Sequence, residues 1–388
     1  MPTPGEPGRV LVAMSGGVDS SVAAAMLHEQ GVETVGVWMR LHDAADTYSE
    51  FKKSCCSLDA AEDARRVAGQ LGIPFYILNL EREFGAGVLR PFLDAYQSGE
   101  TPSPCVDCNS TVKFGALAGR ARRLYDCQAV ATGHYARVDA VDDPEARDGR
   151  RFRLLRGRDA DKDQSYFLYG LRQDQLAHSR FPLGELTKSE VRDVARRHGL
   201  VTAEKPESQE ICFVPGGDYR EALRERGGWR PTSGPLLDAD GRQVGEHAGA
   251  AAYTVGQRQG LGVALGEPRY VARIDAAANV IQLGRREDLA RNVFAMRDVS
   301  FTAGRPPSGD AFECEIRIRH RAGPVPARVE RLTADVPGMR GTWQVQTRET
   351  VWAPAPGQAA VCYDGDEVLG GGRIATEAPR ARRPATGA

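Results

Sequence analysis

A glycine-rich turn close to the start of the chain constrains the fold more than any other feature. Residues 9–14 form a short apolar, β-branched run, which is typical of a buried parallel strand. Residues 21–30 carry a run of alanines and spaced aliphatic side chains, and Gly31 is a typical helix stop. Between them stands Ser15-Gly16-Gly17-Val18-Asp19-Ser20. The segment therefore predicts a strand, a tight turn and a helix whose N-terminus can hold an anion.

The first half of the chain alternates apolar strands with helical periodicity. Besides the first strand and helix, we expect strands at 33–39, 74–80 and 128–132, and helices at 58–71 and 114–124. A capping box at 187–190 predicts a further helix that ends near 198. This alternation indicates an α/β fold with a doubly wound, mainly parallel sheet, whose ligands bind beyond the C-terminal strand ends. Ser15 and Gly133 both stand at such ends.

From about residue 208 the chain becomes rich in glycine, proline and short alternating segments, which indicate strands. We expect two small β-rich domains there, and the second is predicted to be a β-barrel. The predicted limits are 9–207 for the α/β domain, 208–288 for the central domain and 289–375 for the barrel, with disordered tails at 1–8 and 376–388. The predicted strands are 243–245, 270–274, 280–283, 312–318, 327–332, 342–346 and 358–363.

Composition excludes several classes of protein. A formal net charge of −1 over 388 residues excludes a globally basic nucleic-acid binder, so any RNA contact must come from local clusters. One such cluster is an arginine stripe in which Arg317, Arg319 and Arg321 share one face of a predicted strand, with Arg328 and Arg331 nearby. No apolar run is long enough for a membrane helix, and residues 1–8 lack a signal peptide. We therefore expect a soluble, cytoplasmic protein with no membrane partner.

The cysteines indicate thiol or metal chemistry rather than a disulfide scaffold. Cys105 and Cys108 form a C-x-x-C pair in a proline-punctuated segment that we expect to be a loop; it could be a redox pair, half a metal site, or a nucleophile with a neighbour. A four-cysteine zinc site would need a second such pair, which the chain lacks. Cys212 is either their remote partner or a small buried side chain. We interpret the remaining cysteines as structural: Cys55, Cys56, Cys127, Cys314 and Cys362.

The glycine-rich turn is not an ordinary P-loop, because the G-x-x-x-x-G-K-[ST] pattern and its lysine are absent. It resembles the PP-loop of the ATP pyrophosphatases, which hold the β,γ-pyrophosphate as a leaving group and transfer AMP to a substrate oxygen. Further motifs make the chain, from residue 9 to 375, resemble the tRNA-specific 2-thiouridylases. These motifs lie at 15–20, 101–109, 132–137, 159–168, 208–215, 253–261 and 355–358.

The resemblance implies a fold of the adenine nucleotide alpha hydrolase type and a two-stage reaction. ATP adenylates the C2 oxygen of the wobble uridine at position 34, and sulfur from a cysteine persulfide then replaces that oxygen. The products are 2-thiouridine, AMP and pyrophosphate. The resemblance also implies tRNAs for Lys, Glu and Gln as substrates, with Mg²⁺ as cofactor. A cysteine desulfurase or a sulfur-relay protein would supply the sulfur.

The resemblance assigns roles residue by residue. Cys212 would carry the persulfide, Cys108 would be the nucleophile, and a disulfide between them would close each turnover; Asp19 would be a catalytic or metal partner. The implied ATP-binding residues are Ala13, Met14, Ser15, Gly16, Gly17, Val18, Asp19, Ser20, Met39 and Gly133. The implied tRNA-binding residues are Ser103, Pro104, Cys105, His134, Lys162, Asp163, Gln164, Arg319, His320 and Gln358.

One departure from the family leaves alternatives open. Many members carry Asn-Pro-Asp where this chain has Ser103-Pro104-Cys105. Cys105, Cys108 and Cys212 could therefore hold an iron–sulfur cluster that carries the sulfur in place of a persulfide. Another ATP pyrophosphatase, such as an amidotransferase-linked synthetase or a 4-thiouridine synthetase, would share the PP-loop. A non-catalytic tRNA-binding or cluster-carrier protein would leave the PP-loop unexplained.

Overall fold

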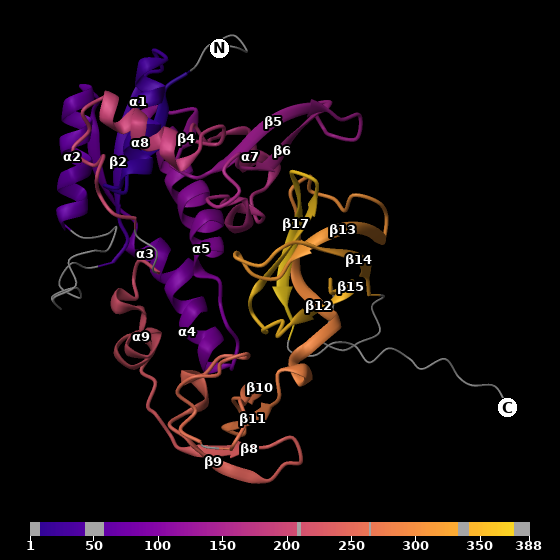
Figure 1. Ribbon diagram of the computed structural model, residues 1–388. Helices are drawn as coiled ribbons and strands as arrows, with labels where there is room; N and C mark the ends of the chain where they lie inside the picture. The colour runs from indigo at the N-terminus through magenta and orange to yellow at the C-terminus, as the bar shows by residue number, and fades with distance from the viewer. Residues whose placement is uncertain (1–7, 43–57, 208–210, 264, 333–340, 376–388) are drawn as a thin grey trace.

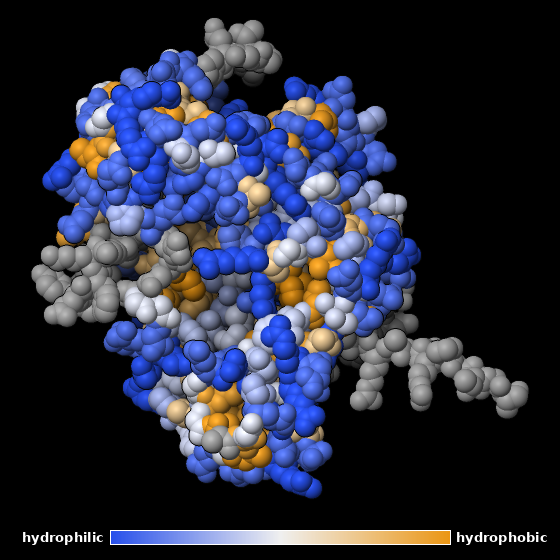
Figure 2. Space-filling view, in the orientation of Figure 1, coloured by the Kyte–Doolittle hydropathy of each residue, from blue (hydrophilic) through white to orange (hydrophobic). Residues whose placement is uncertain are grey.

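The computed structural model describes residues 8–42, 58–207, 211–263, 265–332 and 341–375. The predicted tails at 1–8 and 376–388 lie outside the described residues, apart from Gly8, and so do Cys55 and Cys56. Figure 1 shows an α/β part at the upper left, a small sheet at the bottom and a barrel at the right. Figure 2 shows a hollow between these three parts on a face that is otherwise mostly hydrophilic.

The α/β part is built on a sheet with the strand order β3-β2-β1-β4-β7, in which all neighbours are parallel. All four residues of β1 are buried, as expected for a strand covered on both faces. The prediction of a mainly parallel, doubly wound sheet is confirmed. The strands are β1 (Val10–Ala13), β2 (Thr34–Arg40), β3 (Phe75–Asn79), β4 (Ala129–Ala131) and β7 (Ser179–Arg180).

Three predicted helices follow their sequence signals closely. They are α1 (Val18–Glu29), α2 (Leu58–Leu71) and α8 (Lys188–Arg197). The capping box that opens α8 is present: the Thr187 hydroxyl accepts from the N–H of Glu190 at 3.4 Å, and the Glu190 carboxylate accepts from the N–H of Thr187 at 2.7 Å. These contacts satisfy backbone N–H groups that a helix start would otherwise leave unpaired.

The C-x-x-C pair lies in a helix, so the prediction of a loop there was wrong. The helical segment begins at Pro104 instead of near residue 114. Proline is tolerated there, because the first residue of a helix does not use its N–H in a hydrogen bond within the helix. Its parts are α5 (Pro104–Asp107), the π-helix η3 (Cys108–Leu117) and α6 (Ala118–Tyr125). Helices that the sequence did not indicate are α3 (Glu81–Phe84), the π-helix η2 (Gly85–Leu89), α4 (Arg90–Gln97), α7 (Gln173–Ala177) and α9 (Tyr219–Glu225).

The central part is a four-stranded sheet in the order β10-β11-β8-β9 with its own small apolar core. Leu236, Val271 and Ile281 in that core are completely buried. The predicted strands at 243–245, 270–274 and 280–283 are present. The four strands are β8 (Gly234–Leu237), β9 (Gln243–His247), β10 (Tyr270–Asp275) and β11 (Val280–Gly284).

The C-terminal part is a closed barrel, as predicted. Its strand order is β12-β15-β14-β13-β16-β17, and pairing of β12 with β17 closes it around Phe294, Phe312 and Trp343. Closure removes the unpaired edges that an open sheet would present. The strands are β12 (Ala290–Phe301), β13 (Ala311–Arg317), β14 (Val325–Arg331), β15 (Trp343–Trp352), β16 (Ala359–Asp364) and β17 (Glu367–Ile374).

The predicted arginine stripe is not on one strand face. Strand β13 ends at Arg317, and the chain turns immediately afterwards. Arg317 itself closes the turn, since its guanidinium donates to the carbonyls of His320 and Ala322. Arg319 then reaches the carbonyl of Ala353 at 2.6 Å, while Arg321 is exposed. The prediction that Arg317, Arg319 and Arg321 point to one face of a strand was therefore wrong.

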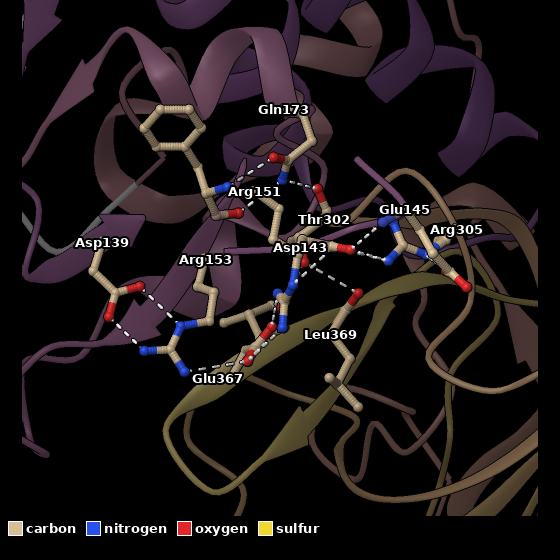
Figure 3. A network of polar contacts seen from close by, with 12 residues as sticks. Asp139, Asp143, Glu145, Arg151, Arg153, Gln173, Thr302, Arg305, Glu367 and Leu369 are labelled. Carbon is tan, nitrogen blue, oxygen red and sulfur yellow. Dashed lines mark hydrogen bonds and ion pairs between the residues drawn. The ribbon is translucent and has the colours of Figure 1, made fainter. Parts of the chain in front are cut away.

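A hairpin from the α/β part continues the barrel sheet. Strands β5 (Ala136–Asp142) and β6 (Arg150–Arg156) pair with each other, and β6 meets β17 where Leu155 faces Glu367. Figure 3 shows the polar contacts around this junction, including Arg151 with Glu367 and Arg305 with Asp143. The barrel is thus attached to the segment that directly follows β4.

Among the described helices, none combines the length and the apolar character that crossing a bilayer requires.

Candidate active site

The PP-loop lies between β1 and α1, where the sequence predicted it. Gly16 has a φ of +72°, and a Cβ there would lie 2.1 Å from the carbonyl oxygen of Ala60, so this position requires glycine. Ser20 Oγ accepts from the N–H of Ser15 at 3.0 Å and donates to the carbonyl of Gly17 at 3.2 Å. Among the residues that the structure describes, no side chain caps α1 at Gly17. The first N–H groups of this 12-residue helix therefore face the loop as an anion-binding end.

Gly133 is pressed against the PP-loop from the neighbouring strand. A Cβ on Gly133 would lie 2.7 Å from both the carbonyl carbon of Asp19 and the nitrogen of Ser20. Strands β1 and β4 are neighbours in the sheet. The chain continues from β1 to β2 on one side and from β4 to β7 on the other, so a crevice opens at the C-terminal ends of β1 and β4. The predicted nucleotide residues 13–20 and Gly133 therefore lie together. Met39, on β2, is partly buried against the main core, and its contact with a nucleotide stays a prediction.

A chain of alternating charges runs from the PP-loop to a predicted tRNA motif. Asp19 Oδ1 accepts from Lys188 Nζ at 2.7 Å, and Lys188 also contacts Glu207 Oε1 at 3.0 Å. Glu207 Oε2 in turn accepts from Lys162 Nζ at 2.8 Å. The hydroxyl of Tyr135 donates to the same oxygen of Asp19 at 2.8 Å. Asp19 and Lys162, which the sequence placed in separate motifs, are thus joined through two residues that it did not single out.

Two lysines of the described ranges lie beside the loop, although the P-loop lysine is absent from the sequence. Lys188 is one, with its side chain only 13% exposed. Lys205 is the other: its ammonium donates to the carbonyl of Gly16 at 2.9 Å and to Asp63 Oδ2 at 2.6 Å. Lys188 directly follows Thr187, the first residue of the capping box. Because that box marks the start of a helix in an α/β fold, it is the signal that could have drawn attention to Lys188.

The pKa shifts keep Glu207 charged and the rings of Tyr135 and His134 neutral. Burial alone would raise the pKa of Glu207, but hydrogen bonds from Lys162 and Lys188 outweigh it and lower the pKa. Burial and the adjacent Asp19 raise the pKa of the Tyr135 phenol, so it stays a donor. Burial and the charge of Lys113 hold the pKa of His134 well below its usual range. His134 is therefore neutral near pH 7, with Nδ1 2.7 Å from Thr132 Oγ1.

The predicted tRNA motifs at 162–164 and 319–320 lie side by side. His320 Nε2 is 2.8 Å from the carbonyl oxygen of Asp163. Asp163 is only 3% exposed, and its carboxylate accepts from Arg317 Nη1 at 3.1 Å and from the N–H of Ser165 at 3.0 Å. Gln164 Oε1 accepts from the N–H of Tyr135 at 3.1 Å, which ties this motif to the tyrosine beside Asp19. Direct contacts of these residues with tRNA stay predictions.

A third predicted tRNA segment, 103–105, lies against Gln358 of the barrel. The N–H of Ala359 donates to Ser103 Oγ at 3.4 Å, and the N–H of Thr101 donates to the carbonyl of Pro356 at 2.7 Å. Pro104 is buried, whereas Cys105 is exposed. Gln358 Oε1 is buried with no hydrogen-bond partner in the described part of the chain. The structure therefore places Ser103 against the barrel segment 356–359, which includes Gln358.

Cys108 and Cys212 both pack against the main core, Cys108 from a helix and Cys212 from an irregular segment. Cys108 opens η3 and is 8% exposed within the main core, and Cys212 is half-buried against that core. Next to Cys212, the ring of Phe213 packs edge-on against Phe84 at 5.4 Å and Phe92 at 5.0 Å between ring centroids. The helical segment that carries these two phenylalanines also contacts η3. Both cysteines are thus anchored to one helical unit.

A nearby positive charge lowers the pKa of a thiol, and two cations of the α/β part, Lys113 and Arg137, lie in different places relative to Cys108. Lys113 lies on η3, the same helix as Cys108, and its charge acts on His134. Arg137 lies at the junction with the barrel, where it donates to the carbonyl of Arg156 at 2.7 Å and to Asp366 at 2.6 Å. Lys113 is therefore the better placed of the two for Cys108.

No group of three or more His, Cys, Asp or Glu residues within the described ranges is arranged to hold a metal ion. Cys105, Cys108 and Cys212 all lie within those ranges. The geometry thus gives no support to a three-cysteine cluster.

Comparison with known proteins covers almost the whole chain. A model described as a tRNA methyl transferase HUP domain matches residues 8–216, a tRNA methyl transferase PRC-barrel domain matches 223–285, and an aminomethyltransferase beta-barrel domain matches 291–374. A tRNA-specific 2-thiouridylase MnmA from Roseiflexus sp. (strain RS-1) is 49% identical over 95% of this chain and 100% of its own length. The protein of the same name from Geobacter metallireducens is 48% identical over 94% of this chain and 96% of its own.

The chain belongs to the tRNA-specific 2-thiouridylase family. The family predicted from the motifs is thereby confirmed. The class of enzyme is confirmed as well, since the relatives with this name align over nearly the whole chain. Nothing in these relatives supports the iron–sulfur alternative.

Solved structures give weaker matches. A 4-thiouridine synthetase–RNA complex with bound ATP aligns at 17% identity over 56% of this chain and 50% of its own, with a TM-score of 0.33. An NMN synthetase from Francisella tularensis aligns at 17% identity over 59% of this chain and 80% of its own, with a TM-score of 0.32. Alignments this weak carry no argument about function.

Proposed function

We propose that this chain catalyses ATP-dependent 2-thiolation of the wobble uridine of tRNA, through adenylation and a cysteine persulfide. The observation that carries the proposal is the charge chain Asp19–Lys188–Glu207–Lys162, because it joins an anion-binding loop to a motif implied in tRNA binding. An enzyme that adenylates a tRNA base needs those two sites in contact.

ATP would bind with its β- and γ-phosphates at the N-terminus of α1. The backbone N–H groups of residues 16–18 and the helix dipole favour the anion, and Gly133 lets the nucleotide come close to the chain. Ala13, Met14, Ser15 and Ser20 shape the loop, and Met39 flanks the adenine side. Lys188 and Lys205 supply the positive charge that the P-loop lysine supplies elsewhere.

Mg²⁺ would accompany the nucleotide, and Asp19 is a protein carboxylate that could hold it. One protein carboxylate is enough for an ion that arrives bound to ATP, because Mg²⁺ commonly takes one or two carboxylates plus phosphates and water. Asp19 is the acidic residue of the loop. When bound, the ion would neutralise charge on the departing pyrophosphate. Lys188 and Tyr135 meanwhile hold the Asp19 carboxylate in place.

The adenylation step needs the uridine beside the loop. The neutral His134 follows Gly133 directly and would contact the base, since a neutral ring packed beside Phe114 and Phe181 suits an uncharged pyrimidine. The C2 oxygen attacks the α-phosphorus, the bond to the β-phosphate oxygen breaks, and pyrophosphate leaves. Lys162, Gln164, Arg319 and His320 would hold the surrounding nucleotides, with Ser103, Pro104 and Cys105 facing the target base and Gln358 behind them.

Asp163 would act differently from its two neighbours. Its carboxylate is buried and engaged by Arg317 and backbone N–H groups, so we propose that it positions the turn that carries His320. Its contribution to tRNA binding would then be indirect.

Sulfur transfer would use the two anchored cysteines. The terminal sulfur of a Cys212 persulfide attacks C2, and AMP leaves with the original oxygen. The Cys108 thiolate then attacks Cys212 Sγ, the S–S bond breaks, and 2-thiouridine leaves. A Cys108–Cys212 disulfide remains, which cellular thiols reduce. This scheme leaves Cys105 without a chemical step.

The remaining assignments complete the proposal. The tRNAs for Lys, Glu and Gln would be the substrates, and a cysteine desulfurase or sulfur-relay protein would load Cys212. A reducing cytoplasm suits a cycle in which thiols regenerate the enzyme. We keep 9–207, 208–288 and 289–375 as the limits of the three domains.

The test uses anaerobically purified full-length protein, unmodified tRNA, ATP and a persulfide donor. Iron and acid-labile sulfide are assayed beside 2-thiouridine formation in the wild type, Cys105→Ser, Cys108→Ser and Cys212→Ser. We expect iron-free wild type and Cys105→Ser to form 2-thiouridine. We expect Cys108→Ser and Cys212→Ser to release pyrophosphate in a tRNA-dependent manner but to form no 2-thiouridine.

Two results would overturn parts of the scheme. Thiolation that requires bound iron and is lost in Cys105→Ser would replace the persulfide by a cluster. Wild-type thiolation by Cys108→Ser or Cys212→Ser would remove that cysteine from the mechanism. The half-buried Cys314 of the barrel gives the matched control, Cys314→Ser, which should retain activity.

A further inference from the structure

The barrel contacts the segment 100–107, which leads into the C-x-x-C pair. Arg297 of β12 donates from Nη2 to Glu100 Oε2 at 2.5 Å. At the other end of the segment, Arg373 of β17 donates from Nη2 to Asp107 Oδ1. Figure 1 shows α5, which Asp107 ends, on the side of the α/β part that faces the barrel. Arginines from two barrel strands thus reach the segment that carries the cysteines.

The contact between this segment and the barrel is close. Gly357 has a φ of +84°, and a Cβ there would lie 2.9 Å from Glu100 Cβ and 3.0 Å from the nitrogen of Thr101. The N–H of Thr101 also donates to the carbonyl of Pro356 at 2.7 Å. A shift of the segment would therefore break backbone contacts as well as ion pairs, so the barrel fixes the path of the chain into the C-x-x-C pair.

The ion pair between Asp107 and Arg373 is largely buried. Their side chains are only 16% and 22% exposed. Burial raises the pKa of Asp107, Arg373 opposes that rise, and the nearby Asp298 adds to it. The carboxylate therefore depends on Arg373 for its charge. Removing one partner of such a pair leaves a buried charge without compensation, which forces the chain around it to rearrange.

Asp107 is held through its backbone as well as through its side chain. Its carbonyl accepts from Thr111 Oγ1 at 2.6 Å. Asp107 is the last residue of α5, and Cys108 is the first residue of the π-helix η3. π-helical turns occur frequently at functional sites. The residue directly before the proposed nucleophile is thus fixed from two sides, although no step of the reaction above uses it.

We infer that Arg373 holds Asp107 so that Cys108 is aligned for its attack on Cys212 Sγ. The inference rests on the proposed function, which gives Cys108 that attack. In this step a bond forms between the two cysteine sulfurs, the bond from Cys212 Sγ to the uridine-bound sulfur breaks, and 2-thiouridine leaves. The attack requires a thiolate in line with the bond that breaks, so its rate depends on alignment.

Arg373 and Asp107 are positioning residues, since both act through Cys108. Adenylation precedes this step and does not use Cys108. Loss of the ion pair should therefore slow 2-thiouridine formation and leave pyrophosphate release intact. A merely structural role would change both rates together.

The test measures both rates in a single turnover, with full-length protein, unmodified tRNA, ATP and a persulfide donor. We expect Arg373→Gln and Asp107→Asn each to form 2-thiouridine about tenfold more slowly or worse, because small misplacements of a reacting group cost this much. Pyrophosphate release should stay near the wild-type rate, which also shows that the variants fold. Arg373→Lys keeps the charge and should recover much of the loss. The double variant should be no slower than the slower single variant, because both substitutions remove the same pair.

Two further variants separate this role from docking of the barrel in general. Arg297→Gln removes the contact with Glu100 and should slow 2-thiouridine formation less than Arg373→Gln does. Arg348→Gln removes an exposed arginine of β15 and should change neither rate.

Three results would overturn the inference: wild-type 2-thiouridine formation in Arg373→Gln and Asp107→Asn, an equal loss in Arg297→Gln, or a parallel loss of pyrophosphate release. Wild-type thiolation by Cys108→Ser would contradict the proposed function instead, so the two failures are distinguishable.

Discussion

Lys188 holds its ammonium group between Asp19 and Glu207, at 2.7 and 3.0 Å, with little exposure to solvent. We predict that Lys188→Met lowers the rate of tRNA-dependent pyrophosphate release by about 10²-fold or more, because a buried charge aimed at developing negative charge is typically worth that much. Lys188→Arg should restore part of the rate. Pyrophosphate release and ATP affinity are measured together, since a purely structural role would change stability and leave the rate of folded enzyme intact.

Arg197→Met provides the control for Lys188→Met, because Arg197 lies on the same helix and is exposed. It should keep the wild-type rate. A Lys188→Met enzyme that folds and releases pyrophosphate at the wild-type rate would contradict the role given to this lysine.

Glu207 makes the stability of the site depend on pH. Its folded-state pKa lies below the ordinary 4.5, since the hydrogen bonds from Lys162 and Lys188 outweigh the effect of burial. A lowered pKa stabilises the fold above the unfolded-state value, and this contribution disappears as the pH falls through the folded-state value. We predict that acidification below pH 6 lowers the free energy of unfolding less in Lys162→Met than in the wild type. Urea unfolding at a series of pH values measures this free energy. Identical pH profiles for the two proteins would contradict the prediction.

At the scale of elements, the sequence predicted those whose signals are local. Strand β1, helix α2 and the capping box of α8 were all indicated by short-range patterns. The helical run from 81 to 97 was missed, because Gly85, Gly87 and Pro91 look like turn signals. It forms because Phe84 and Phe92 pack on Phe213, which lies over a hundred positions further along the chain. Such a contact cannot be derived from a local pattern.

The candidate site divides in the same way. The PP-loop, Gly133 and the cysteines carry recognisable spacing, and the motifs identified them. Lys188 and Asp19 are 169 positions apart, and neither spacing nor periodicity relates them. Their contact depends on how α8 packs beside α1, which only the folded chain determines.

The contact between the end of β4 and the start of α1 gives a prediction for these elements. A Cβ on Gly133 would collide with the backbone of Asp19 and Ser20 at 2.7 Å, so the turn must shift. We predict that Gly133→Ala destabilises the protein by about 1–3 kcal/mol and weakens ATP binding. Gly119→Ala on α6 is the matched control, because no atom lies within 4 Å of its Cβ position; it should stabilise by about 0.5–1 kcal/mol. Calorimetry and ATP titration test both, and unchanged ATP affinity in Gly133→Ala would contradict the proposed close approach.

At the scale of the whole molecule, the α/β part and the barrel share a continuous sheet through β17, β6 and β5. The hairpin β5–β6 begins at Ala136, directly after Tyr135, whose hydroxyl holds Asp19. A displacement of the barrel would therefore reach the PP-loop through a single residue. If RNA binds against the barrel and ATP binds at the loop, as proposed above, this covalent and hydrogen-bonded structure would couple the two sites.

Arg305 tests this coupling, because it fastens the barrel to the hairpin tip through Asp143 and Glu145, both at 2.8 Å (Figure 3). We predict that Arg305→Gln lowers the hydrogen-exchange protection of β6 and β17 several-fold. It should also lower tRNA-dependent pyrophosphate release, with ATP affinity unchanged, since the loop itself is intact. Arg348→Gln, which removes an exposed arginine of β15, should alter neither quantity. If Arg305→Gln loosened β6 and β17 while tRNA-dependent release kept its wild-type rate, the barrel would serve to hold tRNA without acting on the PP-loop.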